Sequence, residues 1–273
     1  MVYHIPSPNL ILSRLTKSPF FQKVIFSKFD TMGSIQDSEL VPKHSTISPA
    51  IFYWGTPVVL ITTENPDLSF NIAPMSSAWW LGNRCMLGLG AISQTTINLL
   101  RTKQCVLNLA SDSMTGAVNA LARTTGSEEI LTAKPDEGYK YFKRMNGYVY
   151  VHDKFGHAKL TPLKSDLVRP ARIMECPAQM EAELVGVYEM MQDADTKGFI
   201  ALEVKVLRTH VHEEIRMDGK ENRIDPDKWR PMIMSFQELY GLKGRKVDDS
   251  VLARIGEEEY RGFSNAAEVE VVN

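Results

Sequence analysis

The sequence predicts a mainly β fold with flanking helices, and three observations support that prediction. Residues 58–63 and 86–92 are apolar runs of strand length. Residues 178–184 and 201–206 alternate between apolar and polar side chains. No crossover helix follows either alternating segment, so we expect the two to pair antiparallel in a barrel.

The composition is that of an ordinary globular chain. With 273 residues, 44% of them hydrophobic, it is long enough for one substantial core with extensions, or at most two domains. The formal net charge is −2, and the chain has no basic stripe and no RNA-type aromatic motif, so nucleic acid is not an expected partner. No apolar run approaches the ~18 residues that a membrane span needs, so a membrane is not expected either.

The first 45 residues differ from the rest. Residues 1–29 contain no Asp or Glu, and their Lys and Arg residues are interleaved with apolar side chains, as in a mitochondrial transit peptide. An alternative of equal weight is that Met32 is the true start. We expect a cytoplasmic protein, or a mitochondrial one if residues 1–31 are a genuine transit peptide. The expected organisation is an N-terminal extension over residues 1–44, a folded domain over 45–263 and a flexible tail over 264–273.

The cysteines indicate reduced thiols. Cys85, Cys105 and Cys176 are odd in number and far apart, and each lies in or beside apolar, strand-like sequence. This pattern supports neither a disulfide framework nor a zinc site. We expect three buried thiols of an intracellular protein.

A hairpin and a capped helix are expected in the first half of the domain. The turn residues 64–67 separate the run 58–63 from an extended pattern at 70–74, which predicts a β-hairpin. The sequence Ser-Gln-Thr-Thr at 93–96 follows the strand 86–92, and its Ser can cap a helix. The apolar face of that helix is expected to comprise Ile97, Leu100 and possibly Leu99.

Such a helix start can bind an anion, because its first backbone N–H groups lack partners and its dipole favours negative charge. The hydroxyl groups of Ser93, Thr95 and Thr96 add donors there. Gly88 and Gly90 leave room for a flat ligand or a neighbouring backbone. Taken alone, local chemistry favours the simpler interpretation of a capped amphipathic helix without a ligand.

A dinucleotide-binding motif is a rival interpretation of the same stretch. Residues 88–93, GLGAIS, lie between a strand and a helix as the Rossmann G-x-G-x-x-G does, but Ser93 replaces the third Gly. The acidic residue expected about 20 positions on is missing, and the chain lacks repeated βαβ alternation. A Rossmann domain is therefore rejected.

Helices are expected on both sides of a Gly- and charge-rich stretch. Apolar residues recur at helical spacing from Met114 to Ala122 and again from Tyr139 to Met145. Residues 123–126 between them are interpreted either as part of a substrate rim or, preferably, as a solvated helix end with Gly126 at the C-cap. A further helix is expected over residues 248–260.

Acidic and histidine residues on the later strands are not assigned to catalysis. Glu181, Glu183 and Glu203 occupy alternate strand positions and are expected to face water, or Glu181 to pair with Arg169 or Arg172. His210 and His212 share a face, but a third metal ligand at a convincing spacing is missing, so no metal is predicted. A place on a cleft rim or an ordinary surface or core role is preferred for the two histidines.

The tryptophans are expected to serve packing. Trp79 and Trp80 are adjacent on a strand and face opposite ways, so one should be in the core and the other at a dimer contact. Trp229 can stack on a ring, although buried aromatic side chains mostly fill cores and interfaces.

Several segments resemble the flavin reductase-like family, whose fold is the FMN-binding split β-barrel. The segment NIAPMSS at 71–77 resembles the family's Asn-x-Ala-Pro-x-Ser strand, and SQTTINLLRTKQCVLNLAS at 93–111 resembles its phosphate segment and Val-x-Asn-Leu strand. Segments 167–185 and 223–234 continue the similarity, which covers about residues 51–244. The matching motif positions are Asn71, Ala73, Pro74, Ser76, Thr95, Asn98, Val106, Asn108 and Leu109.

The resemblance implies FMN as the cofactor, NAD(P)H as the reductant, a small-molecule acceptor, and a homodimer with FMN at the subunit interface. It places the phosphate at the helix start, the ring along the strand with residues 75–77 at its N5 and O4 edge, and Tyr240 near the flavin. The implied cofactor-binding residues are Asn71, Ala73, Met75, Ser76, Ser77, Gly90, Ala91, Ser93, Thr95, Thr96 and Asn98.

The chain departs from the family pattern at two places. Leu68 stands where the family commonly has Gly in the first hairpin turn, and the neutral pair Ser93 and Gln94 stands where a charged residue commonly precedes the phosphate Thr. The countercharge for the phosphate then falls to Arg101 on the same helix or to a partner subunit.

The leading hypothesis is an FMN-binding oxidoreductase that transfers hydride from NAD(P)H, by way of FMN, to a flavin or a small organic acceptor. Such transfer depends on positioning and needs no general acid or base, so no catalytic residue is assigned. Two alternatives stay open: a flavin-binding electron carrier or ligand-binding protein without its own turnover, and a structural split-barrel dimer that has lost flavin.

Overall fold

The computed structural model describes residues 44–49, 52–194, 198–242 and 250. Contacts divide the chain into two units, Met1–Ala50 and Ile51–Asn273, and the described part of the first unit has no regular secondary structure. Most of the predicted N-terminal extension, the predicted tail and all but one residue of the predicted helix at 248–260 lie outside the described residues. In the part of the chain that is described, no helix is long and apolar enough to cross a membrane.

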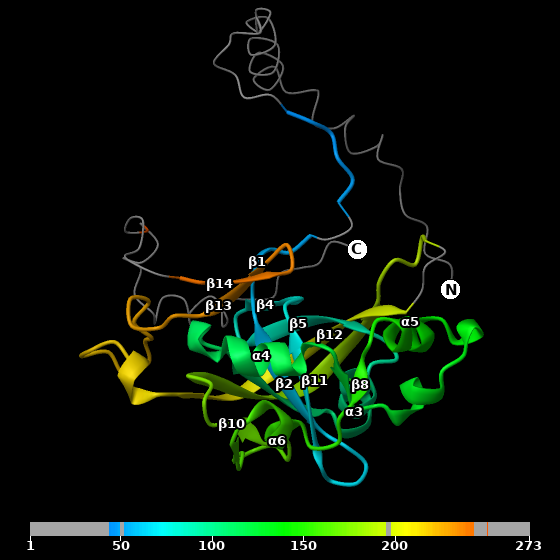
Figure 1. Ribbon diagram of the computed structural model, residues 1–273. Coiled ribbons are helices and arrows are strands. Elements are labelled where there is room, and N and C mark those ends of the chain that lie inside the picture. Colours follow the sequence, from blue (N-terminus) through cyan, green and yellow to red (C-terminus); the bar gives the residue numbers. More distant parts are fainter. Residues whose placement is uncertain (1–43, 50–51, 195–197, 243–249, 251–273) are drawn as a thin grey trace, which may run out of the picture. The chain divides into compact units, whose positions relative to one another are not determined.

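A seven-stranded antiparallel sheet forms the centre of the second unit (Figure 1). Its strand order is β3-β2-β6-β11-β12-β5-β4, and every neighbouring pair is antiparallel. This confirms the mainly β fold and agrees with the rejection of a doubly wound sheet. The strands are β2 (Val59–Glu64), β3 (Phe70–Met75), β4 (Ala78–Leu81), β5 (Arg84–Gly90), β6 (Gln104–Leu109), β11 (Ala178–Glu189) and β12 (Phe199–Val211).

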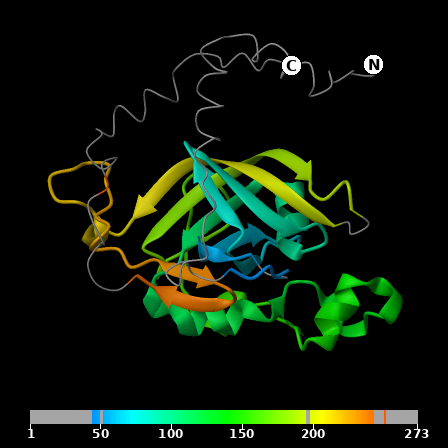
Figure 2. The same cartoon turned by 90° about the horizontal axis from the view of Figure 1, so that it is seen from above.

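Two predicted strand pairs are present. The strands β2 and β3 form the expected hairpin, with Val59 opposite Met75. The long strands β11 and β12 pair over their whole length, and their register shifts between Glu181 and Ala182 and again between Leu184 and Gly186. Such irregularities bend and twist a strand, which allows the sheet to curl. Figure 2 shows the curled sheet from above.

Two hydrophobic cores lie on opposite faces of β2. Val59 and Ile61 pack inside the curled sheet with residues of β5, β6, β11 and β12. Leu60 packs in a second core with residues of the helices α4 (Thr115–Ala122) and α6 (Lys154–Ala158). Because successive strand residues point to opposite faces, a strand between two cores is buried on both faces, and all six residues of β2 are buried. Cys85, Cys105 and Cys176 are free thiols in these cores, which confirms that they are buried.

The helices and short strands surround the sheet. In Figure 1, α4 lies in front of the sheet and α5 projects to one side. The helices are α3 (Gln94–Thr102), α4 (Thr115–Ala122), α5 (Tyr139–Met145) and α6 (Lys154–Ala158), with 3-10 turns η1 (Asp112–Met114), η2 (Glu128–Thr132), η3 (Pro135–Glu137) and η4 (Glu213–Ile215). The short strands are β7 (Thr124–Thr125), β8 (Val149–Tyr150), β9 (Pro162–Leu163) and β10 (Arg172–Ile173).

A C-terminal hairpin forms a separate small sheet with the first strand. Strands β13 (Met232–Ser235) and β14 (Glu238–Gly241) pair with each other, and β13 also pairs with β1 (Trp54–Pro57). In Figure 2 this hairpin, in orange, lies alongside the green helix α4. The hairpin therefore forms a wall near the end of β3, where the site described below is located.

The helix α3 buries a different face from the one predicted. Leu99 is fully buried, but Ile97 and Leu100 are 46% and 37% exposed. The prediction was wrong for these two residues, because the hairpin beneath the helix offers polar partners and selects its polar face. The other buried positions of the helix are Thr95, Thr96 and Asn98.

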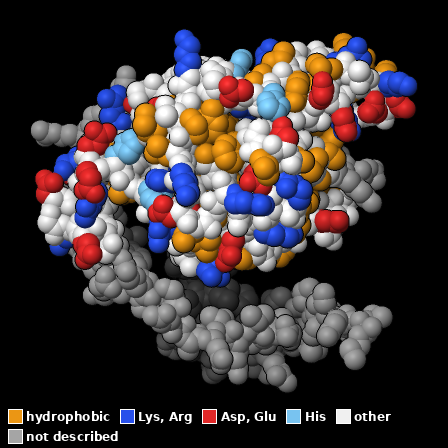
Figure 3. All heavy atoms as spheres, turned by 90° about the horizontal axis from the view of Figure 1, so that it is seen from below, with side chains coloured by type: hydrophobic (Ala, Val, Ile, Leu, Met, Phe, Trp, Pro, Cys, Tyr) orange, Lys and Arg blue, Asp and Glu red, His pale blue; other side chains and the backbone are white. Residues whose placement is uncertain are grey.

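Charged side chains of both signs are interspersed over the surface shown in Figure 3, around a central apolar area. This face carries no large field of a single sign, as the net charge of −2 leads one to expect.

Candidate functional site

A cavity of about 140 Å³, here called the lysine cavity, lies where β3, the end of β5 and the first turn of α3 meet. The C-terminal end of α4, residues 124–126 that follow it, and residues of the segment 139–154 complete its lining. The apolar wall comes from β3 and β5. The polar residues of the lining are Asn71, Ser93, Gln94, Thr95, Thr124, Thr125, Tyr139, Lys143, Tyr148 and Lys154.

The start of α3 is capped as predicted. The hydroxyl of Ser93 accepts a hydrogen bond of 3.2 Å from the backbone N–H of Thr96. The hydroxyl of Thr96 in turn donates to the carbonyl of Gly90 at 2.9 Å, and Thr96 is fully buried. These bonds fix the helix start against the end of β5. Thr96 is therefore a structural residue and does not line the cavity.

Asn71 and Thr95 present unused hydrogen-bonding groups at the lysine cavity. The side-chain amide of Asn71 donates to the hydroxyl of Thr95 at 2.9 Å, so the Thr95 hydroxyl proton is left to donate elsewhere. The side-chain oxygen of Asn71 is buried and has no hydrogen-bond partner among the described residues. A buried acceptor without a hydrogen bond destabilises the fold, so this oxygen is a candidate to accept a hydrogen bond from a bound ligand.

Two lysines supply positive charge that sequence reasoning did not find. Lys154 is only 3% exposed, and its ammonium group donates to the carbonyl of Ile72 at 2.8 Å. Burial, together with the charge of Lys143, lowers the pKa of Lys154 to about 7. Burial also lowers the pKa of Lys143, whose ammonium group lies 4.8 Å from the ring centroid of Tyr139.

No acidic side chain lines this cavity in the described part of the chain. Two cations that lose hydration and repel each other are stabilised by an anion between them. The lysine cavity is thus suited to an anionic group, because both hydroxyl donors and lysine side chains line it. In a single sequence no motif distinguishes Lys143 or Lys154 from the other lysines.

The predicted cofactor residues divide between this cavity and its surroundings. Asn98 lies outside it and is structural, since its amide donates to Thr63 at 3.1 Å and to Asn65 at 2.7 Å. Ser77 and Ala91 also lie outside the lining. Those that line the lysine cavity are Asn71, Ala73, Met75, Gly90, Ser93 and Thr95.

The two glycines on β5 lie against different neighbours, so each position lacks a side chain for a different reason. A Cβ atom on Gly88 would lie 3.1 Å from the Cβ of Ser77, whose carbonyl accepts a 2.8 Å hydrogen bond from the Gly88 N–H. Gly88 therefore accommodates a neighbouring backbone. Gly90 lines the lysine cavity and faces the ring of Tyr139.

Residues 124–126 form part of the cavity rim, and the preferred interpretation of them as a solvated helix end was wrong. The helix α4 is capped by Arg123, not Gly126. A Cβ atom on Gly126 would lie 2.7 Å from the side-chain oxygen of Asn71 and 2.9 Å from the Cγ of Gln94. Glycine is therefore required at position 126, because the side chains of Asn71 and Gln94 leave no room for a Cβ atom there.

A second cavity of about 260 Å³, here called the hairpin cavity, shares Pro74, Met75 and Ala122 with the first. Its remaining lining comes from Tyr53 and Val58 on either side of β1, from Ser76, from α4 and from the hairpin β13–β14. Ser76, predicted to bind the cofactor, lines this cavity instead. Tyr240, expected near the flavin edge, is 57% exposed and lines neither cavity.

Other assignments made from the sequence change with the structure. The guanidinium group of Arg101 donates to the carbonyl of Glu64 and does not line the lysine cavity. Trp79 is 56% exposed while Trp80 packs partly buried against the core inside the sheet, as the alternation predicted. Trp229 packs against the same core and lines neither cavity.

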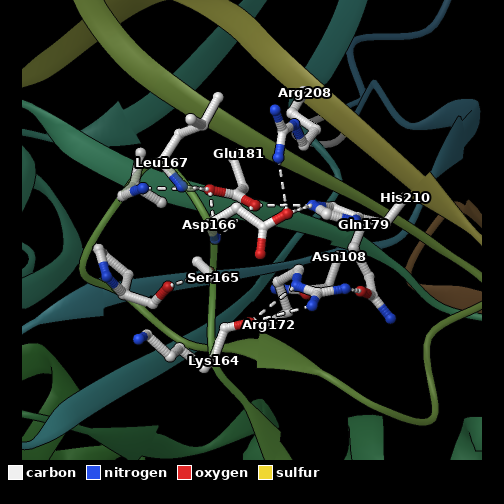
Figure 4. A network of polar contacts seen from close by, with 12 residues as sticks. Asn108, Lys164, Ser165, Asp166, Leu167, Arg172, Gln179, Glu181, Arg208 and His210 are labelled. Atoms are coloured by element: carbon white, nitrogen blue, oxygen red, sulfur yellow. Dashed lines mark hydrogen bonds and ion pairs between the residues drawn. The ribbon is translucent and has the colours of Figure 1, made fainter.

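Glu181 is fully buried, so the expectation that it faces water or pairs with Arg169 or Arg172 was wrong. Its carboxylate accepts hydrogen bonds from the backbone N–H groups of residues 166–168 and contacts His210 at 2.6 Å (Figure 4). Burial by itself raises the pKa of Glu181, but these hydrogen bonds outweigh burial, and the pKa is lowered. Glu183 and Glu203 do lie at the surface, where they pair with Lys205 and Arg84.

This cluster is a structural clamp. Ligand atoms of Asp166, Glu181 and His210 lie within 4.8 Å of one another, which is close enough to hold a metal ion. The hydrogen bonds to Glu181, however, already engage the lone pairs that a metal would need. His212 donates to the carbonyl of Met174 at 3.0 Å, and neither histidine lines either cavity.

Comparison with known proteins adds to this geometry. The model of the flavin reductase like domain matches residues 53–225. The uncharacterised protein YdfE of Bacillus subtilis (strain 168) is 39% identical over 201 residues, which cover 74% of this chain and 90% of YdfE.

Solved structures resemble the fold. Flavoredoxin of Desulfovibrio vulgaris (Miyazaki F) has a TM-score of 0.60 and 18% identity, covering 78% of this chain and 99% of its own. Component B of nitrilotriacetate monooxygenase from Bacillus cereus has a TM-score of 0.55 and 18% identity, covering 76% and 99%. These likenesses confirm the expected split-barrel fold.

Proposed function

Because the chain belongs to the flavin reductase-like family, a family of flavin-binding split-barrel proteins, we propose that it is an FMN-dependent NAD(P)H oxidoreductase. The lysine cavity would hold the phosphate of FMN. The observation that carries this proposal is the pairing of Lys143 and Lys154 with the hydroxyl-rich start of α3 in a lining without acidic side chains.

The residues present fit a phosphate monoester. Such a group carries up to two negative charges and several acceptor oxygens. Thr95 and the two lysines are donors, and the N-terminus of α3 adds backbone N–H groups and its dipole. In this proposal the two lysines supply the countercharge for the phosphate, in place of Arg101 or a partner subunit.

The rest of the flavin would extend along β3. Asn71 offers an unpaired acceptor to a ligand N–H or hydroxyl, and Ala73 and Met75 give an apolar surface for a ring. The chemistry that such a cofactor supplies is two-electron transfer between NAD(P)H and a second substrate. The part of the protein is to hold the reacting rings close and exclude water, which explains why no acid–base dyad is needed.

We also propose that the active unit is a homodimer. The lysine cavity, at about 140 Å³, is smaller than the roughly 300–1,000 Å³ of typical ligand pockets, so one subunit alone covers FMN incompletely. Ile97 and Leu100 are exposed apolar residues on α3, the helix whose first turn lines the cavity, and a second subunit would cover them.

Titration of the purified protein with FMN and with riboflavin tests the proposal. FMN fluorescence should be quenched at far lower protein concentrations than riboflavin fluorescence, since riboflavin lacks the phosphate. The loaded protein should absorb near ~450 nm and oxidise NADH or NADPH when an acceptor is supplied. Equal affinity for the two flavins would contradict the phosphate assignment. Tight FMN binding without NAD(P)H oxidation, across a panel of acceptors, would favour an electron carrier.

A further inference from the structure

The hairpin cavity has an apolar lining and uncharged polar groups at its edge. The apolar residues include Val118, Met234 and Leu239. No charged side chain lines it in the part of the chain that the structure describes. Its volume of about 260 Å³ lies just below the roughly 300–1,000 Å³ of small-molecule pockets, so it suits a ring and not a dinucleotide.

Four polar side chains at this cavity make no hydrogen bond within the described residues. They are the hydroxyls of Tyr53 and Ser76 and the amides of Asn119 and Gln237. Binding pockets for small molecules typically combine an apolar lining with a few such groups, which fix the orientation of the ligand. The amides and the hydroxyls can both donate and accept, so they suit carbonyl and hydroxyl groups.

Gln237 is held at the cavity by a strained turn. Phe236 and Gln237 form the two-residue loop between the paired residues Ser235 and Glu238, with φ angles of +47° and +70°. Such loops favour Asn and Gly, and larger side chains there are strained. Two contacts of Phe236 hold the turn. Its ring packs edge-on against the ring of Trp54, with the ring centroids 4.4 Å apart, and its backbone N–H donates to the carbonyl of Tyr53 at 2.8 Å.

The base of the hairpin is fixed as well. Arg230 donates to the carboxylate of Asp112 at 2.7 and 3.0 Å, and the N–H of Met232 donates to the carbonyl of Ala110 at 2.9 Å. The hairpin is therefore a rigid wall and not a loose tail. It also lies beyond residue 225, where the match to the family model ends.

We propose that the hairpin cavity binds the second substrate, an uncharged planar ring compound that carries carbonyl or hydroxyl groups. The inference rests on the proposed function, because the cavity adjoins the lysine cavity through Pro74, Met75 and Ala122. The apolar walls contact the ring faces, and Ser76, Asn119 and Gln237 contact its polar groups. A charged compound is excluded because burying an ion without a partner is costly.

Equilibrium dialysis of the full chain loaded with FMN, without reductant, tests the proposal. The probes are menadione, an uncharged naphthoquinone, and 1,4-naphthoquinone-2-sulfonate, its anionic counterpart. Menadione should bind about tenfold more tightly than the sulfonate. Gln237→Gly removes a side-chain amide and also relieves the backbone strain of the turn. Asn119→Ala removes a side-chain amide from an exposed position on α4. Each should weaken menadione binding about fivefold, as the loss of one neutral hydrogen bond does.

A gain-of-binding variant and a matched control complete the test. Gln237→Lys should bind the sulfonate several-fold more tightly than the wild type does, whereas Glu238→Gln, one residue further on, should leave both probes unchanged. Menadione affinity that is insensitive to all lining variants, or equal affinity of the wild type for both probes, would overturn the proposal. So would a parallel loss of FMN affinity, because the cavity would then belong to the flavin. Failure of the proposed function is distinguishable, since FMN itself would then not bind before any quinone is added.

Discussion

The ammonium group of Lys154 donates a 2.8 Å hydrogen bond to the carbonyl of Ile72 on β3, at the wall of the lysine cavity. A lysine that is 3% exposed and has no carboxylate partner among the described residues is unusual, since buried charges are normally paired. Its one fixed bond points the cation at the β3 strand, beside Asn71 and Thr95. The candidate site therefore already contains a charge that lacks its complement.

Lys154→Met should weaken FMN binding about 10- to 100-fold at pH 7, because a charge-assisted hydrogen bond to phosphate is lost. The pKa of Lys154 is lowered to about 7, and a bound anion favours its protonated form. FMN affinity of the wild type should consequently fall as the pH rises from 7 to 9. Riboflavin affinity should change little over the same range. Fluorescence titrations at both pH values check this, and a pH dependence that persists unchanged in Lys154→Met would contradict it.

Removal of the two hydroxyls at the helix start should have different effects, one on FMN binding and the other on stability. Thr95→Ala removes a donor that faces the cavity and should weaken FMN binding roughly fivefold or more. Ser93→Ala removes the N-cap and should lower the free energy of unfolding by about 1 kcal/mol. Flavin titration and urea denaturation of both variants test the division. The reverse pattern, with Ser93→Ala impairing only FMN binding, would assign the phosphate contact to Ser93.

Glu181→Gln should destabilise the fold by about 2–3 kcal/mol at pH 7, because three backbone N–H groups lose a charged acceptor. The pKa of Glu181 is lowered in the folded protein, so the carboxylate adds stability above its unfolded value of about 4.5 and loses it as the pH falls through the folded pKa. The difference between wild type and variant should therefore shrink below about pH 4.5. Glu183→Gln, at the surface beside Lys205, is the control and should change stability by less than about 0.5 kcal/mol.

The sequence predicted the strands better than it predicted the faces of elements. Alternation and turn residues located the β2–β3 hairpin and the β11–β12 pair, because burial on one side of a strand forces a period of two. Periodicity also found an apolar stripe on α3, but it did not show which side of the helix packs against the rest of the fold. Ile97 and Leu100 were therefore assigned to the core although they face outward. The usual rule is that an amphipathic helix buries its apolar face. It does not hold for α3, because this helix packs on polar residues of the β2–β3 hairpin.

The candidate site was predictable only where it is local in sequence. The capped start of α3 and the β3 residues Asn71 and Ala73 are found from motif and resemblance, and both line the lysine cavity. Lys143 and Lys154 reach it from a segment about 50 residues further along the chain, and their role depends on burial that a sequence does not display. Glu181 was misassigned for the same reason, since its partners are backbone groups of residues 166–168.

Leu68→Gly should stabilise the protein by about 1 kcal/mol. Leu68 is 68% exposed in the β2–β3 turn with a φ of +69°, a left-handed conformation that costs an L-residue roughly 1–2 kcal/mol and that glycine adopts freely. Part of this gain is offset by the greater freedom of glycine in the unfolded chain. Gly82→Ala is the matched control, since Gly82 has a φ of +56° with open space around it and should lose about as much as Leu68→Gly gains. Urea denaturation of both variants measures the difference, and a destabilised Leu68→Gly would mean that the Leu68 side chain makes a stabilising contact worth more than its backbone strain.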